Sequence, residues 1–149
     1  MDDVLIKVCA LNDFYSTNIF SPFTVARHIV DLKIDKYLAI NDLNIVNKIA
    51  NVKMSNGARI NFYSFATKYC SHHKPTVYPI YDSYVDKFLM FHKRKDKFSK
   101  FNKGDLKVFP KYKRILDDFR KFYGLEKYNL KLIDKYLWQA GKKYFPRKY

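Results

Sequence analysis

Apolar residues recur every three or four positions along most of this chain, a pattern that restricts its fold to packed helices. In residues 61–72, the apolar side chains that share one helical face are Phe62, Phe65, Ala66, Tyr69 and Cys70. A helix with this spacing buries that face against a core. We therefore expect a helix over residues 61–72, with Lys68 at the edge of its buried face.

Capping residues and prolines mark where other helices begin and end. Helices are predicted to begin near Val4 and at Ser21-Pro22, Asn41, Asp82, Pro110 and Asn129. Their predicted inward-facing residues are Val4, Leu5, Val8 and Leu11; Val25, Ala26, Ile29 and Val30; Leu43, Val46, Ile49 and Ala50; Val85, Phe88 and Leu89; Ile115, Leu116, Phe119 and Tyr123; and Leu130, Ile133, Leu137 and Ala140. Gly124 and Gly141 are predicted to end the last two helices. Pro75 and Pro79 predict a loop over residues 73–81.

Asn56-Gly57 has two interpretations. This dipeptide is typical of a short β-hairpin, and it also forms tight turns between helices. We favour the tight turn because helices are predicted on both sides. Since no internal repeat and no second core are visible, the sequence predicts one all-α domain over residues 1–149, a compact helical bundle.

Composition favours one folded domain in a reducing compartment. Of the 149 residues, 48% are hydrophobic and 18% are aromatic, which suits a domain with a substantial core. No apolar run reaches the about 18 residues that a membrane span needs, and Met1-Asp2-Asp3 is acidic where a secretory signal would be basic. Cys9 and Cys70 are too few for a disulfide framework. We expect a cytoplasmic protein that has no membrane partner. If its partner is DNA, we expect the protein to be associated with the nucleoid.

The net charge of +15 is concentrated in the second half of the chain. Residues 87–149 contain 20 Lys and Arg against 6 Asp and Glu, whereas residues 1–86 contain 9 against 8. This excess is more than solubility requires, and it predicts an anionic partner, with nucleic acid ahead of a membrane surface.

Aromatic rings alternate with these cations, notably in residues 91–95, 98–101, 109–113 and 144–149. Such a mixture suits contacts to phosphates and to bases. Residues 93–107 are the best candidate for a mobile or DNA-facing stretch. A composition rich in Lys, Asn and Tyr that reflects an AT-rich genome is the alternative explanation.

Lys68 and Asp82 are the pair best suited to chemistry. Desolvation at the edge of an apolar helix face favours the neutral, nucleophilic form of a lysine. A helix N-terminus favours the ionised form of an aspartate. Such a pair suits attack on a sugar carbon, with the lysine as nucleophile and the carboxylate stabilising positive charge. The alternative is an ordinary snorkelling lysine and an ordinary helix cap.

The string INFYSFATKYC, followed after a short loop by YPIYDSYV, resembles the catalytic segment of helix-hairpin-helix DNA glycosylases, particularly the 8-oxoguanine DNA glycosylases. The similarity covers about residues 52–92. It implies a reduced form of that family's helical body, with Lys68 as the Schiff-base nucleophile and Asp82 as the catalytic carboxylate. The implied activity is excision of a damaged base from double-stranded DNA, with a strand-nicking lyase step and with no metal or cofactor.

The resemblance also implies which residues surround the substrate. A flipped base would enter a pocket with aromatic walls. The expected pocket residues are Phe65, Tyr69, His72, Tyr81 and Trp138. The residues expected to contact the nucleic acid are Asn56, Gly57, Arg59, Lys93, Arg94, Lys95, Lys97, Lys100 and Lys103. The family hairpin usually has two glycines, whereas this chain has Asn56-Gly57.

Two other functions fit the same residues. One is a basic helical module that binds DNA or RNA without catalysis. The other is a toxin-like ribonuclease that uses His72 or His73 as acid and base. Cys70 lies close to both histidines in the sequence, but no second pair stands at a zinc-site spacing, so we expect no metal.

Overall fold

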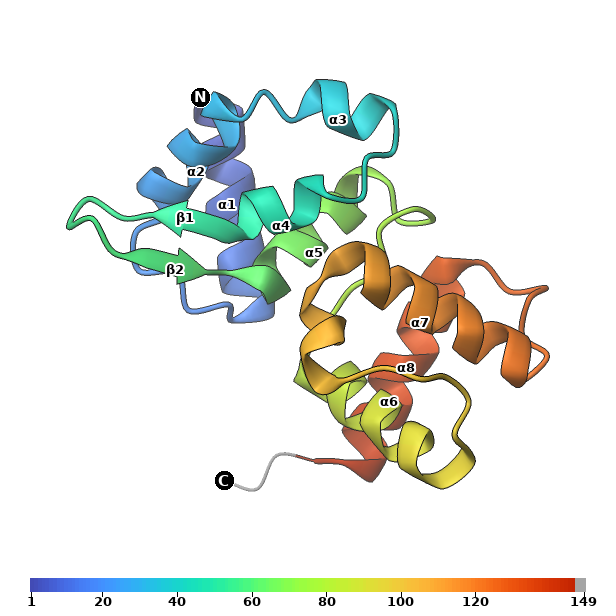
Figure 1. Ribbon diagram of the computed structural model, residues 1–149. Helices are drawn as coiled ribbons and strands as arrows, with labels where there is room; N and C mark the ends of the chain where they lie inside the picture. The colour runs from blue at the N-terminus through green and yellow to red at the C-terminus, as the bar shows by residue number, and fades with distance from the viewer. Residues whose placement is uncertain (147–149) are drawn as a thin grey trace. The chain divides into compact units, whose positions relative to one another are not determined.

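Helices account for most of the chain in the computed structural model, which describes residues 1–146 (Figure 1). The predicted all-α class is confirmed. The chain forms two compact units, which we call unit 1 (Met1–Lys74) and unit 2 (Pro75–Tyr149), where the sequence predicted one domain. The boundary falls inside the predicted loop 73–81. The end of the basic run 144–149, from residue 147 onward, lies outside the described residues.

Unit 1 combines helices with one small antiparallel sheet. Its elements are α1 (Asp2–Tyr15), α2 (Pro22–Asp31), α3 (Asp35–Ala39), α4 (Ile45–Ala50), β1 (Asn51–Lys53), β2 (Arg59–Asn61) and α5 (Tyr63–His73). Helix α1 packs against α2 and α5, and α4 packs against α5. The fully buried side chains between them include Val25, Ile29, Val46, Ile49 and Phe65. Helix α5 confirms the helix predicted over residues 61–72.

Three details of unit 1 differ from the prediction. Helix α4 begins at Ile45 with Asn44 as its N-cap, because Asn41 takes the left-handed conformation (φ +57°) and cannot start a helix. Leu43 precedes that helix and is half-buried, as is Phe62 just before α5. Val30, predicted to face inward, is exposed near the end of α2.

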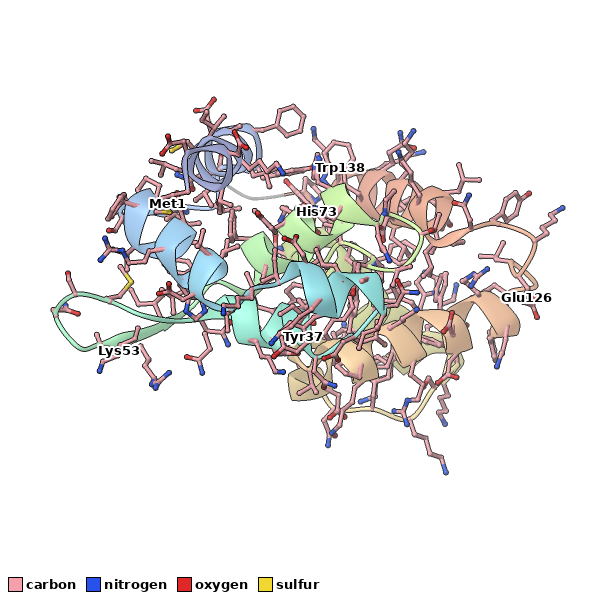
Figure 2. The ribbon with its side chains drawn as sticks, turned by 90° about the horizontal axis from the view of Figure 1, so that it is seen from above. Met1, Tyr37, Lys53, His73, Glu126 and Trp138 are labelled. Atoms are coloured by element: carbon pink, nitrogen blue, oxygen red, sulfur yellow. The ribbon has the colours of Figure 1, made fainter. Side chains whose placement is uncertain are left out.

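A β-hairpin occupies residues 51–61, so the predicted tight turn between helices is wrong. The amide of Gly57 donates to the carbonyl of Met54 (2.9 Å), and the amide of Met54 donates to the carbonyl of Ala58 (2.8 Å). Gly57 has a φ of +84°, which a residue with a Cβ rarely adopts. This is a three-residue hairpin loop with glycine in the left-handed position. Figure 2 labels Lys53, which lies on this hairpin.

Unit 2 contains longer helices and no strand within residues 75–146. Its elements are α6 (Ser83–Asp96), the 3-10 helix η1 (Lys103–Lys107), α7 (Phe109–Phe122) and α8 (Leu130–Tyr144). Asp82 and Asn129 cap α6 and α8 as predicted: Asp82 accepts two backbone N–H groups of the first turn, and Asn129 accepts one. Gly124 (φ +64°) follows the end of α7 as predicted. Tyr123, predicted to face inward, is half-buried at the C-cap of α7.

Helix α8 passes through Gly141, so the predicted stop at this residue is wrong. A Cβ at Gly141 would lie 2.8 Å from the backbone oxygen of Tyr84 in α6. The absence of a side chain at Gly141 therefore allows α8 to approach α6 closely, and this glycine does not end the helix. The helix continues to Tyr144.

The stretch 93–107, expected to be mobile or DNA-facing, has a defined structure as part of unit 2. Lys97 ends α6 in the left-handed conformation, and Phe98, Phe101 and Leu106 are buried. Asn102 and Asp105 form a capping box at the start of η1. These contacts give the stretch one defined path, so its charged side chains are displayed from a fixed backbone.

Candidate nucleic-acid interface

The residues predicted to act together are divided between the two units. Unit 1 contains Lys68, the hairpin residues Asn56, Gly57 and Arg59, and three of the predicted pocket residues. Unit 2 contains Asp82, Tyr81, Trp138 and the predicted cations from Lys93 to Lys103. Each unit is therefore described separately below.

Lys68 lies on the buried side of α5. Its side chain is 5% exposed. The ammonium nitrogen contacts the hydroxyl and the backbone carbonyl of Ser64, one turn earlier, and lies 5.3 Å from the ring centroid of Tyr15. The lysine is thus more deeply buried than the helix-edge position that the sequence predicted.

Asp82 acts as the N-cap of α6. One carboxylate oxygen accepts the backbone N–H groups of Tyr84 and Val85, both at 2.9 Å. The segment before it is held at Ile80, whose N–H donates to Asp134 (2.9 Å) and whose carbonyl accepts the hydroxyl of Tyr112 (2.6 Å). These bonds fix the entry into α6, which places Asp82 on a rigid part of unit 2.

Asp134 has an unusual environment for a carboxyl group. It lies on the buried face of α8, and its second oxygen has no hydrogen-bond partner among the described residues. Burial raises its pKa from 3.8 to about 8, although the bond from the Ile80 N–H lowers it. The carboxyl of Asp134 is therefore mostly protonated at neutral pH.

The predicted base-pocket residues are divided between the two units. Phe65 and Tyr69 are core residues of unit 1, with ring centroids 5.9 Å apart, and burial raises the pKa of Tyr69 to about 12. In unit 2, Tyr81 is buried and donates its hydroxyl to Asp86 (2.7 Å). Trp138 lies on the exposed side of α8, under the ammonium group of Lys142.

Tyr69 and His72 do share a cavity of about 500 Å³ in unit 1, which α1 and α5 line. His73 and Phe14 also line it. His72 is exposed, and its Nε2 lies 3.0 Å from the hydroxyl of Tyr15. Burial and the nearby Lys7 lower the pKa of His73. The two histidines of the ribonuclease alternative therefore stand at the edge of this cavity.

Cys70 is fully buried on the same helix, and burial raises the pKa of its thiol to about 12. Within residues 1–146, no group of three His, Cys, Asp or Glu side chains is arranged to bind a metal ion. No helix in the same residues has the length and hydropathy needed to cross a membrane.

The hairpin residues Asn56, Gly57 and Arg59 are exposed. The side chain of Asn56 accepts the N–H of Ala58 (3.0 Å) and so stabilises the loop. Arg59 lies on β2. The hairpin thus presents one of the predicted cations to solvent from unit 1.

Six predicted cations of unit 2 lie along α6, the loop after it and η1. Arg94, Lys95, Lys97, Lys100 and Lys103 are exposed, and Lys93 is half-buried with its ammonium 5.1 Å from the ring centroid of Phe101. Lys103 is 3.8 Å from Asp86. These six cations all lie in residues 93–103, whose backbone follows one defined path in unit 2.

The aspartates of unit 2 are held by internal contacts, whereas most of its cations face solvent. The residues 75–149 contain 20 Lys and Arg against 8 Asp and Glu, a net charge of +12. The aspartates and their partners are Asp82 with the α6 amides, Asp86 with Tyr81, Asp96 with His92 and Tyr123, Asp105 with Lys111, Asp117 with Arg120, Asp118 with Ser99, and Asp134 with Ile80. The hydrogen bond from Lys111 lowers the pKa of Asp105. The solvent-facing charge of unit 2 is therefore strongly basic.

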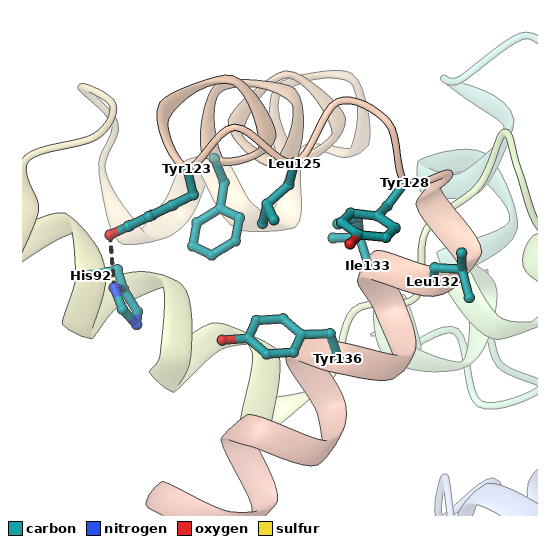
Figure 3. Close-up of a pocket in the computed structure, with 8 residues that line it drawn as sticks. His92, Tyr123, Leu125, Tyr128, Leu132, Ile133 and Tyr136 are labelled. Carbon is teal, nitrogen blue, oxygen red and sulfur yellow. Dashed lines mark hydrogen bonds between the residues drawn. The ribbon is translucent and has the colours of Figure 1, made fainter.

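Unit 2 also contains a pocket that no sequence pattern indicated. It has a volume of about 510 Å³ and lies between α6, the end of α7 and α8. Figure 3 shows Tyr123 and Leu125 on one side of this space and Tyr136 on the other. Tyr128 and His92 also line it. The walls are mostly aromatic and aliphatic, which is the usual composition of a small-molecule site.

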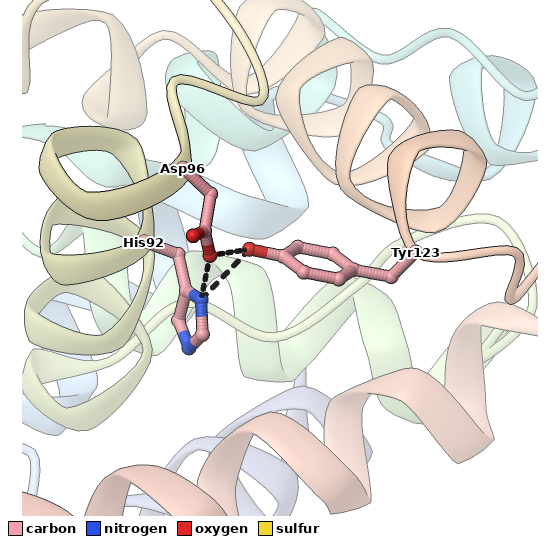
Figure 4. Close-up of polar contacts among 3 residues, drawn as sticks. All are labelled: His92, Asp96 and Tyr123. Carbon is pink, nitrogen blue, oxygen red and sulfur yellow. Dashed lines mark hydrogen bonds and ion pairs between the residues drawn. The ribbon is translucent and has the colours of Figure 1, made fainter.

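A polar cluster of three residues adjoins this pocket (Figure 4). His92 Nδ1 lies 3.1 Å from a carboxylate oxygen of Asp96 and 2.8 Å from the hydroxyl of Tyr123. That hydroxyl donates to the same Asp96 oxygen. The bonds from Tyr123 and His92 lower the pKa of Asp96, whereas burial and the Asp96 bond raise the pKa of Tyr123. Because Tyr123 lies 27 residues after Asp96, no local motif could have revealed the cluster.

Two comparisons with known proteins match this chain, one over its first half and one over almost its whole length. A family model described as HI_0787_N, N-terminal domain, matches residues 1–77. The chain is also 45% identical over 148 residues to a protein of Haemophilus influenzae described as uncharacterized, and the match covers 99% of this chain and 70% of that protein. The chain belongs to the HI_0787_N family. No solved structure matches the chain.

The HI_0787_N match ends close to the boundary between the two units. It includes the hairpin and Lys68, whereas Asp82 and the predicted cations of unit 2 lie beyond it. The HI_0787_N domain therefore corresponds to unit 1, and the basic surface belongs to the part of the chain that follows this domain.

Proposed function

We propose that the chain binds DNA through the basic surface of unit 2. One observation carries this proposal: the aspartates of the unit are tied to internal partners, while five of the six cations in residues 93–103 are exposed, and Lys93 and Lys95 lie over aromatic rings. Phosphate contacts from such a surface supply affinity without requiring sequence specificity. RNA is the other nucleic acid that the same charges would attract.

The salt dependence of binding tests this proposal. Anisotropy of a labelled short duplex, titrated between about 50 and 200 mM salt, gives the number of phosphates neutralised, since each contributes about 0.9 to the slope of log affinity against log salt. The test variant is Arg94→Glu/Lys95→Glu/Lys100→Glu in unit 2. Its matched control is Arg27→Glu/Lys36→Glu/Lys48→Glu, which changes three exposed cations of unit 1.

Both variants lose the same net charge, so a nonspecific charge effect would weaken both equally. We expect the unit 2 variant to lose slope, by about 0.9 for each phosphate contact removed, and the control to stay near wild type. Equal weakening of the two variants, or no binding by wild type at low salt, would contradict the proposal.

The second candidate function is a DNA glycosylase and apurinic lyase of the 8-oxoguanine class that acts through Lys68 and Asp82. The low exposure of Lys68 favours it, because a lysine nucleophile needs an environment that disfavours the solvated ammonium ion. Asp82 on the rigid start of α6 suits the carboxylate role. The neutral amine would attack the sugar C1′, and the base would leave with the electrons of its glycosidic bond and take up a proton. The C1′–O4′ bond would then break as the nitrogen lone pair forms the imine, and O4′ would become a hydroxyl by taking the proton that the nitrogen loses.

Borohydride trapping tests this second candidate. The protein is mixed with duplexes that contain 8-oxoguanine, uracil or no lesion, and a covalent protein–DNA band is sought after reduction. We expect a lesion-dependent band that Lys68→Gln abolishes and Lys74→Gln, at the C-cap of the same helix, retains. A circular dichroism spectrum shows whether Lys68→Gln still folds. The absence of a band with every lesion, beside salt-sensitive binding, leaves the non-catalytic module as the function.

A further inference from the structure

The pocket between α6, α7 and α8 is open to solvent and lined by rings. Tyr128 and Tyr136 are 39% and 51% exposed, so large aromatic surfaces remain uncovered on its rim. Its volume of about 510 Å³ suits a ligand of the size of a nucleoside or somewhat larger. Tyrosine faces of this kind stack on planar rings.

At the polar end of the pocket, the hydrogen bonds of His92 determine which of its ring nitrogens can contact a ligand. The contacts of His92 with Asp96 and Tyr123 all use Nδ1. A carboxylate beside Nδ1 favours the tautomer with the proton on that nitrogen. Nε2 is then left for a hydrogen bond to a ligand.

A cation lies next to Tyr128, one of the residues that line the pocket. The ammonium group of Lys127 lies 5.1 Å from the ring centroid of Tyr128. Arg120 holds the backbone on both sides of this lysine, by donating to the carbonyl of Glu126 (2.9 Å) and to that of Tyr128 (2.6 Å). The backbone on both sides of Lys127 is therefore held, and its ammonium group lies over the ring of Tyr128, within reach of an anionic group of a ligand bound against that ring.

We propose that this pocket binds one unpaired nucleobase together with its phosphate. The base would stack between Tyr136 and the opposite wall, hydrogen-bond toward His92, and place its phosphate near Lys127. The inference rests on the proposed binding of nucleic acid by unit 2 and names the ligand that one site of that unit takes. An apolar acyl chain would use neither the polar end nor the cation. Aromatic stacking beside a basic surface is the common way in which proteins hold unpaired strands.

Quenching of 2-aminopurine tests this inference. The probes are a short oligothymidylate with one central 2-aminopurine and, separately, free 2-aminopurine riboside monophosphate. The test variant is Tyr136→Ala, and the matched control is Tyr144→Ala, an exposed tyrosine on the same helix that does not line the pocket. Tyr136 also contacts the ring of Phe88, so an unfolding curve of the variant accompanies each titration.

We expect wild type and Tyr144→Ala to quench the probe. Tyr136→Ala should weaken binding about fivefold or more, which is the size of one stacking contact, with little change in salt slope. A second variant, Lys127→Gln, should instead lower the slope of single-strand binding by about 0.7, which is one phosphate. This pair of results keeps the test decisive even if one variant folds poorly.

Three other outcomes separate the inference from the proposed function. If strands bind wild type but neither Tyr136→Ala nor Lys127→Gln changes their binding, the nucleobase site is refuted and the basic surface alone binds nucleic acid. If only the free monophosphate binds, and does so through Tyr136, the nucleobase site is supported while the nucleic-acid function fails. If neither probe binds, both proposals are overturned.

Discussion

Asp134 is a carboxyl group that unit 2 keeps away from water. In the unfolded chain its pKa is near 3.8, and in the folded protein it is about 8. Between these pH values the folded form holds a proton that the unfolded form releases. The stabilisation from this proton is therefore complete below about pH 4 and is lost as the pH rises through about 8.

Replacement of Asp134 by Asn should remove this pH dependence. The amide oxygen can still accept the N–H of Ile80, but it does not titrate. The wild type should lose free energy of unfolding relative to the variant as the pH rises from 5 to 8, by at most about 1.4 kcal/mol per pH unit. Urea unfolding followed by the fluorescence of Trp138, the single tryptophan, measures this in unit 2. Asp117→Asn is the control, and parallel curves for wild type and Asp134→Asn would contradict the assignment.

Among the elements, the predicted helix starts at Ser21-Pro22, Asp82 and Asn129 were confirmed, whereas the start at Asn41 and the end at Gly141 were wrong. The confirmed signals are local: Asp82 and Asn129 accept N–H groups two or three residues later, and Pro22 suits the first turn of α2 because its ring fixes φ there. The hairpin was misjudged for the opposite reason. Asn56-Gly57 fits both of the turns considered, and the choice between them depends on strand pairing beyond the turn itself.

The candidate sites show the same limit of sequence reasoning. Asp82 could be identified as a cap, but the cluster of His92, Asp96 and Tyr123 joins two helices that are separated by a long stretch of chain. Gly141 was read as a helix end because its role depends on α6, which the local sequence does not contain.

The crossing of α6 and α8 at Gly141 leads to a second prediction. Alanine is the better helix former by about 1 kcal/mol, but its Cβ would lie 2.8 Å from the backbone oxygen of Tyr84. Overpacking of this kind costs about 1–3 kcal/mol, so Gly141→Ala should destabilise unit 2 or leave it without any gain. Gly104→Ala is the control, since nothing lies within 4 Å of its new Cβ. Trp138 fluorescence during urea unfolding measures both, and clear stabilisation by Gly141→Ala would refute the close crossing.

At the scale of the whole molecule, the division into two units agrees with the extent of the HI_0787_N match. Unit 1 ends at Lys74 and the match ends at residue 77. Unit 1 also has its own buried side chains, including Ile45, Val46 and Ile49. The charge is distributed along the same division, since residues 1–74 contain 9 Lys and Arg against 6 Asp and Glu.

Residues 1–77 should therefore fold without the rest of the chain. A small domain buries a limited area, so we expect a cooperative but low-temperature melt with helical circular dichroism. The fragment should bind the duplex far more weakly than the full chain, because the cations of unit 2 are missing. A featureless melt would show that unit 1 depends on unit 2, and full DNA affinity of the fragment would move the binding surface to unit 1.

The two cysteines differ in exposure, so that the rate of thiol labelling can report local opening of the fold. Cys9 is exposed on α1, whereas the thiol of Cys70 is buried in α5, and both belong to unit 1. An alkylating reagent reaches Cys9 at once, but it reaches Cys70 only when the helices around it open. The rate at which the second thiol is labelled therefore reports how often the helices around Cys70 in unit 1 open under native conditions, with unit 2 present in the same chain.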